Sequence, residues 1–102
     1  METPDVNNSQ VYKHEFHEGL NVFEESFDGF QKSKFEAQKD EYNKAMHESL
    51  TGMRDAASGM MNGELQKLRG DLSTNLDNYV KNPSAANEEK VENSINQIKS
   101  AD

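Results

Sequence analysis

The sequence lacks cysteine and tryptophan, has only two prolines, and contains no long apolar run. Without cysteine the chain can form no disulfide, no thiolate nucleophile and no cysteine-based zinc site. No stretch approaches the roughly 18 apolar residues of a membrane span, and the first residues lack the basic and apolar segments of a classical signal peptide. These absences favour a cytoplasmic location and leave open export without a cleaved signal.

Apolar residues and positive charge are also scarce. Hydrophobic residues make up 32% of the 102 positions, whereas globular chains usually have about 45–50% when glycine is included. Such a chain can cover one face of each helix but cannot fill a thick core, and its length suits one domain. The net charge of −8 argues against a nucleic-acid partner and against an anionic membrane surface.

The apolar residues that are present recur at helical spacing. Phe16, Phe23 and Phe30 lie seven residues apart, with Leu20 and Phe27 between them. Spacings of three, four and seven place side chains on one face of an α-helix. A similar stripe follows in methionine, leucine and alanine, for which core packing is the favoured interpretation and contact with a partner the alternative. The predicted partner-binding residues or oligomer seam are Phe16, Leu20, Phe23, Phe27, Phe30, Met46, Met53 and Met60.

We predict an all-α fold in which a second helix folds back along a long first helix and a short C-terminal helix follows. This arrangement is a helical hairpin or small bundle with coiled-coil character. Residues 1–8 are expected to be a disordered lead, and residues 9–102 a single helical domain. The expected helices cover residues 9–50, 53–81 and 84–100, the last beginning after Pro83.

Two positions complicate these boundaries. The register of the apolar stripe shifts at Lys34, where an apolar residue is expected; the next apolar residue is Phe35. This slip either rotates the apolar face around the helix or marks a local irregularity. Thr51–Gly52 is the favoured break between the first two helices, with Asn62–Gly63 as the alternative turn. The glycines there are either turns or a seam that brings two helices close together, namely Gly52, Gly59, Gly63 and Gly70.

The one cluster that resembles a metal site is His14, His17 and Glu18. These side chains fall within one helical turn and could hold a divalent metal if another helix supplied further ligands. The spacing is not that of HExxH, and glutamate and histidine are common on solvated helix faces. We expect no metal and no cofactor. Because no nucleophile elbow or phosphate-binding loop is present either, we expect no enzyme activity.

The segment from Asp77 to Ser84, followed by helix as far as Ile98, resembles the helix–Pro–Ser–helix hairpin of type III secretion needle subunits. The resemblance covers about a fifth of the chain and implies a subunit that assembles with copies of itself.

Three hypotheses for function follow. The first is an acidic helical protein–protein interaction module (an adaptor, chaperone or scaffold) that uses the aromatic and methionine face. The alternative is a self-assembling helical subunit, for example of a secretion apparatus. The third is a metal-binding bundle. A homo-oligomer is expected, with a dimer favoured, because the phenylalanine stripe extends beyond what the short last helix can cover.

Overall fold

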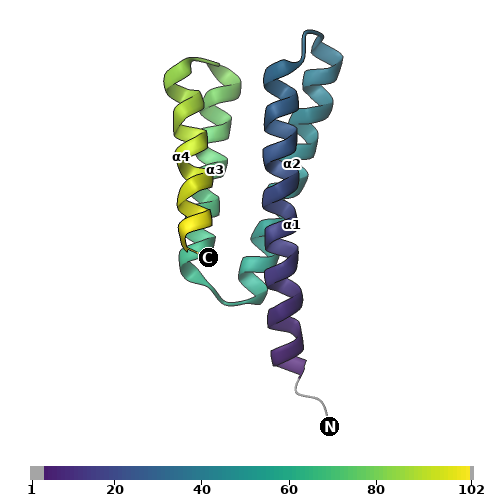
Figure 1. Ribbon diagram of the computed structural model, residues 1–102, viewed down its shortest axis with the longest axis vertical. Coiled ribbons are helices and arrows are strands. Elements are labelled where there is room, and N and C mark those ends of the chain that lie inside the picture. The colour runs from purple at the N-terminus through teal and green to yellow at the C-terminus, as the bar shows by residue number, and fades with distance from the viewer. Residues whose placement is uncertain (1–3, 102) are drawn as a thin grey trace. The chain divides into compact units, whose positions relative to one another are not determined.

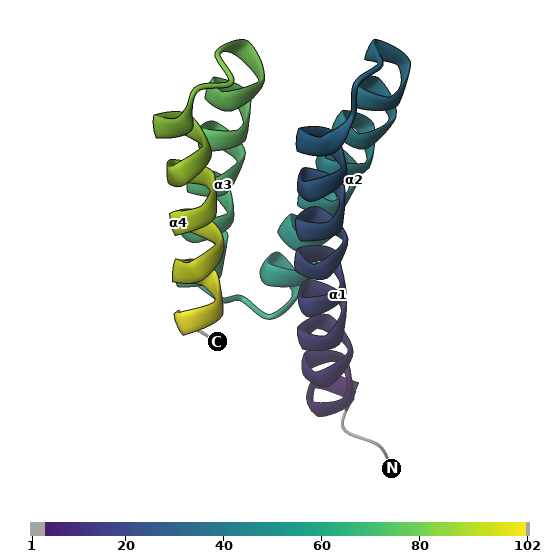
Figure 2. The same cartoon turned by 45° about the horizontal axis from the view of Figure 1, so that its top comes forward.

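The protein is all-α, as the sequence predicts. The structure, a computed structural model, describes residues 4–101, with side chains from residue 10 onward. Four helices follow one another, and they divide into two compact units, Met1–Met61 and Asn62–Asp102 (Figure 1). The first unit pairs α1 (Pro4–Lys32) with α2 (Glu36–Gly59), and the second pairs α3 (Gly63–Lys81) with α4 (Ala85–Ala101). Each unit is an antiparallel helical hairpin (Figure 2).

The predicted long helix over residues 9–50 is wrong, because it is interrupted by the turn between α1 and α2. The Ser33 hydroxyl donates to the Gly29 carbonyl at 2.7 Å, a bond that competes with continuation of the helix. Phe35 is extended (φ −114°, ψ 137°), and its carbonyl accepts the first bonds of α2 from Gln38 and Lys39. The slip of the apolar stripe therefore marks a reversal of the chain.

The predicted lead over residues 1–8 is also corrected in part. Residues 1–3 lie outside the described residues, whereas residues 4–8 belong to α1.

The favoured break at Thr51–Gly52 does not occur, since α2 continues through both residues as far as Gly59. Leu50 and Met53, on either side of this pair, are both buried. Burying such side chains contributes about 1.5–3 kcal/mol each, which outweighs the cost of about 1 kcal/mol for a glycine inside a helix. The chain turns instead at Met60–Asn62, next to the alternative turn.

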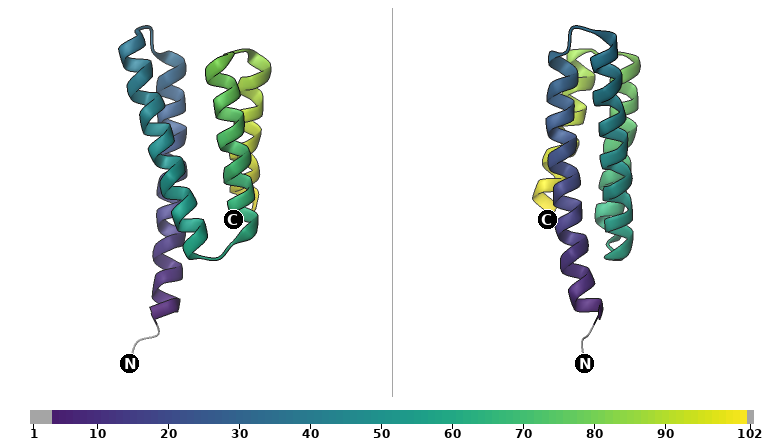
Figure 3. Two further views of the ribbon diagram at one scale, coloured as in Figure 1. Left: turned by 180° about the vertical axis from the view of Figure 1, so that it is seen from behind. Right: turned by 90° about the vertical axis from the view of Figure 1, so that its right-hand side faces the viewer.

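Met61 joins the two units in an unusual backbone conformation. Its φ of 55° is the only positive value among the described non-glycine residues, and its amide donates to the Ser58 carbonyl at 3.0 Å. Figure 3 shows the short loop that it occupies between α2 and α3. The side chain is 87% exposed.

Replacing Met61 with glycine is expected to stabilise the protein by about 0.5–1 kcal/mol, because glycine adopts positive φ without the steric cost of a β-carbon. Urea unfolding followed by circular dichroism measures the change. Met60→Gly is the matched control, since Met60 has an ordinary φ of −79° and its replacement should destabilise. Stabilisation by both variants would contradict this explanation.

Both helices of the second hairpin begin at a capped N-terminus. The Asn62 side chain accepts from the Leu65 amide at 3.0 Å, and the Ser84 hydroxyl accepts from the Asn87 amide at 3.2 Å, as N-cap residues do. Pro83 stands between α3 and α4, where the sequence predicts the helix to stop. The buried apolar side chains are Leu65, Leu72, Leu76, Tyr79, Val91, Ile95 and Ile98.

Candidate interaction surfaces

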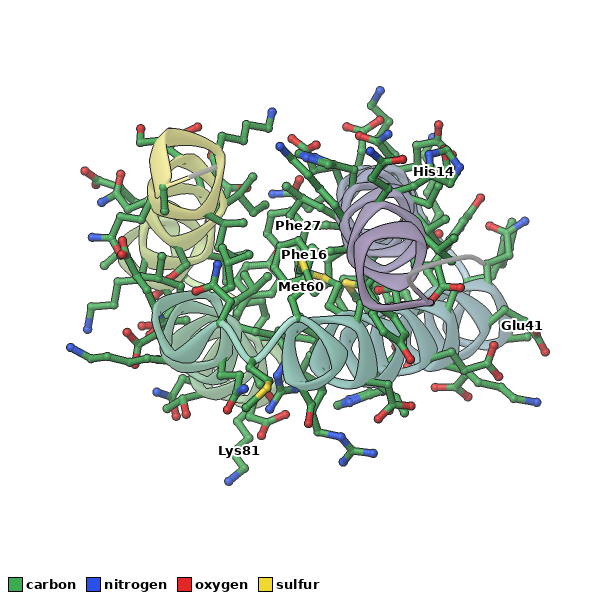
Figure 4. All side chains as sticks on the ribbon, turned by 90° about the horizontal axis from the view of Figure 1, so that it is seen from below. His14, Phe16, Phe27, Glu41, Met60 and Lys81 are labelled. Carbon is green, nitrogen blue, oxygen red and sulfur yellow. The ribbon has the colours of Figure 1, made fainter. Side chains whose placement is uncertain are left out.

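The aromatic and methionine stripe lies mostly inside the structure. Phe30 and Met60 are half-buried. The other six candidate residues of the seam are buried: Phe16, Leu20, Phe23, Phe27, Met46 and Met53. Phe23 and Phe27 stack with ring centroids 6.2 Å apart. In Figure 4, Phe16 and Phe27 lie on one side of α1 and His14 lies on the opposite side. A partner could contact Phe30 and Met60 at the surface, whereas contact with the six buried residues would require the helices to separate.

Three glycines allow close contacts within the first hairpin. A β-carbon on Gly19 would lie 2.7 Å from Met53 Cγ, and one on Gly59 would lie 2.6 Å from the Tyr12 ring. A β-carbon on Gly29 would meet the Tyr42 ring at 2.5 Å. At these distances a β-carbon would force Met53 or a tyrosine ring to move, so glycine at these positions allows the close packing of α1 and α2.

The remaining glycines have other roles. Gly52 and Gly70 lie inside helices and Gly63 begins α3, and a β-carbon on any of the three would meet nothing within 4 Å. Of the four glycines that the sequence leaves as turns or seam, only Gly59 therefore lies in a close-packed seam.

His14 and Glu18 lie on an exposed face, with 3.9 Å between His14 Nε2 and Glu18 Oε1. His17 is half-buried on the same helix. Within the described part of the chain, no three histidine, aspartate or glutamate side chains are placed to hold one metal ion. The His14, His17 and Glu18 cluster thus has no further ligands among those residues.

The turn between α1 and α2 exposes aromatic rings that the sequence pattern assigned to a continuous helix. Phe35 is 67% exposed and Tyr42 is 38% exposed. Phe30 is half-buried, and Lys39 Nζ lies 6.0 Å from the centroid of its ring. An aromatic side chain as exposed as Phe35 is informative because large apolar side chains gain most from burial. The slip at Lys34 was the only sequence signal for it.

This turn is also the most basic part of an acidic chain. Residues 30–39, here called the basic turn, contain three lysines and one glutamate, a net charge of +2. The other 92 residues contain eight basic and eighteen acidic side chains, a net charge of −10. Lys32 pairs with Asp28 at 2.9 Å, whereas Lys34 is exposed at the apex of the turn.

A shallow groove along the exposed side of α1 is acidic, in contrast to the basic turn. Residues 14–31 include five acidic side chains and no lysine or arginine. Val22 lies in the groove and is 43% exposed. The residues that line this acidic groove are Glu18, Asn21, Val22, Glu24, Glu25 and Asp28.

The second hairpin presents a polar surface between α3 and α4. The Asn75 side chain donates to the Ser94 hydroxyl at 2.7 Å and links the two helices. The groove around this bond is lined mainly by polar and charged side chains, including Asp71, Thr74 and Lys90. A second groove of this hairpin contains Leu68, which is half-buried. The large apolar side chains that are exposed among the described residues all lie in the first unit, which therefore carries the stronger candidate surfaces.

Comparison of the chain with protein-family models, curated proteins and solved structures gives no match. None of the helices within residues 4–101 combines the length and the apolar character needed to cross a membrane.

Proposed function

We propose that this protein is a helical protein–protein interaction module that contacts its partner through the basic turn. The observation that carries this proposal is the exposure of Phe35, which is 67% accessible at the apex of a helical hairpin. Aromatic anchors with a charged rim supply much of the energy of protein interfaces. Lys34 and Lys39 supply such a rim, and the proposal thus moves the contact from the buried stripe to the turn.

The arrangement of the first hairpin supports this role. The turn is held by two packed helices, and the Tyr42 ring lies against Gly29 directly beneath it. An anchor presented by a rigid scaffold loses less conformational freedom on binding than one on a mobile segment. The basic turn therefore presents Phe35 in a defined position.

Site-specific photo-cross-linking tests the proposal. With p-benzoylphenylalanine in place of Phe35, we expect a covalent adduct with a partner chain in the cells that produce the protein. The same probe in place of Val11, which is also exposed on the first hairpin, is the control and should give no comparable adduct. Absence of an adduct from position 35, or equal yields from both positions, would refute the proposed contact.

A further inference from the structure

We propose that the partner of the basic turn is a second copy of this chain, and that the turn docks in the acidic groove of α1. This inference rests on the proposed function, since it assumes that the turn is the contact surface. It adds the identity of the partner and the surface that receives the turn.

The charges of the two surfaces are complementary. The basic turn carries Lys32, Lys34 and Lys39, whereas four carboxylates line the groove. No lysine or arginine occurs in residues 14–31, although Lys32 of the same chain pairs with Asp28 at 2.9 Å and His14 Nε2 lies 3.9 Å from Glu18 Oε1. The charge that a second copy adds to the groove therefore comes mainly from its Lys34 and Lys39. Complementary potentials select partners and fix their orientation. At physiological ionic strength the attraction acts over about 8 Å, so it operates once the surfaces approach.

Both surfaces also contain an exposed apolar side chain. Phe35 projects from the turn, and Val22 lies among the carboxylates of the groove. Docking would remove both from water at the centre of a ring of opposite charges. This is the usual arrangement of a protein interface, with an apolar centre and a polar rim.

The proposed contact is head-to-tail and not reciprocal. The turn of one copy docks in the groove of the next, which leaves one turn and one groove unoccupied. Such a heterologous contact continues from copy to copy, unlike the contact in a two-fold dimer. Because a single turn covers a small area, each contact is weak and the assembly grows with protein concentration.

Light scattering after size exclusion, at several concentrations of the full chain, tests the inference. We expect the average mass of the wild type to rise above 11.5 kDa as the concentration increases. The turn variant Lys34→Gln/Phe35→Ser and the groove variant Glu18→Gln/Glu25→Gln should each remain at 11.5 kDa. All four positions are exposed, so circular dichroism should show unchanged helix content.

Mixing the two variants gives the decisive result. The groove variant retains an intact turn and the turn variant an intact groove, so the mixture should form a dimer of one copy of each and grow no further. Glu64→Gln/Asp71→Asn is the matched control, because it removes two exposed carboxylates at the same spacing from α3. This control should grow as the wild type does.

A wild type that stays at 11.5 kDa at every concentration would overturn the inference, and so would a fixed dimer or variants that grow normally. The results that would refute the proposed function differ from those that would refute self-docking. If position 35 cross-links a different protein in cells while the purified chain remains a monomer, self-docking is wrong and the interaction module stands. If position 35 gives no adduct and the chain remains a monomer, both are wrong.

Discussion

Replacing Phe23 with alanine is expected to lower the free energy of unfolding by about 3–5 kcal/mol, the range for a large aromatic side chain removed from a core. Phe23 has no solvent-accessible surface and stacks on Phe27. A small domain has only about 5–15 kcal/mol of stability in total. Urea unfolding followed by circular dichroism should therefore show a much lower midpoint, or a variant that is already unfolded in buffer.

The same substitution at Phe35 is the matched control. Phe35 is 67% exposed, and exposed positions usually change stability by no more than about 0.5 kcal/mol. Phe35→Ala should thus unfold as the wild type does while losing contact with a partner. Equal destabilisation by Phe23→Ala and Phe35→Ala would contradict the assignment of one ring to the core and the other to the surface.

Replacing Gly19 with valine is expected to destabilise the first hairpin by about 1–3 kcal/mol, as overpacking of a core does. The new β-carbon would lie 2.7 Å from Met53 Cγ and 3.2 Å from the carbonyl oxygen of Ser49. Met53 is fully buried and the Ser49 oxygen belongs to the backbone, so neither can move without disturbing the packing. The better helix propensity of valine offsets less than about 1 kcal/mol of this.

Gly52→Val separates this steric effect from the helix propensity of glycine. Gly52 lies inside α2, and a β-carbon there meets nothing within 4 Å. This variant should be as stable as the wild type or slightly more so, by the same urea measurement. A loss at Gly52 as large as that at Gly19 would show that substitution itself, and not close packing, destabilises the helix.

Periodicity predicted the helical fold and most of its core, because burial of one face is what stabilises a helix of this composition. Val91, Ile95 and Ile98 are buried as their spacing predicts. Periodicity failed at the turns. The reversal at residues 33–35 contains neither glycine nor proline, and Ser33 is the one residue there of a type common in turns.

Glycine was misleading in the opposite way. Gly52 suggested a break, yet the buried neighbours Leu50 and Met53 keep α2 continuous. The actual turn uses Met61 at positive φ, a conformation that a sequence pattern assigns to glycine or asparagine. Burial of Leu50 and Met53 decided the first position, and a single sequence does not show which side chains the fold buries.

The basic turn could not be predicted from the sequence, because the exposure of Phe35 depends on where the chain reverses in the folded hairpin. Phe30 and Phe35 read as successive members of a helical stripe, although the chain reverses between them. This reversal brings Lys32, Lys34, Lys39 and the exposed Phe35 ring together at one end of the hairpin. Six of the eight residues predicted as a partner seam are buried, and Phe30 and Met60 are half-buried.

The central claim is that copies of the chain meet through Phe35 and not through the stripe from Phe16 to Phe27. Fluorine NMR of protein labelled with fluorophenylalanine, recorded over a dilution series, tests it in one measurement because the chain has only five phenylalanines. We predict that the Phe35 resonance shifts with concentration while those of Phe16, Phe23 and Phe27 stay fixed. Shifts at the three buried rings with a constant Phe35 would show that the stripe is the seam between copies.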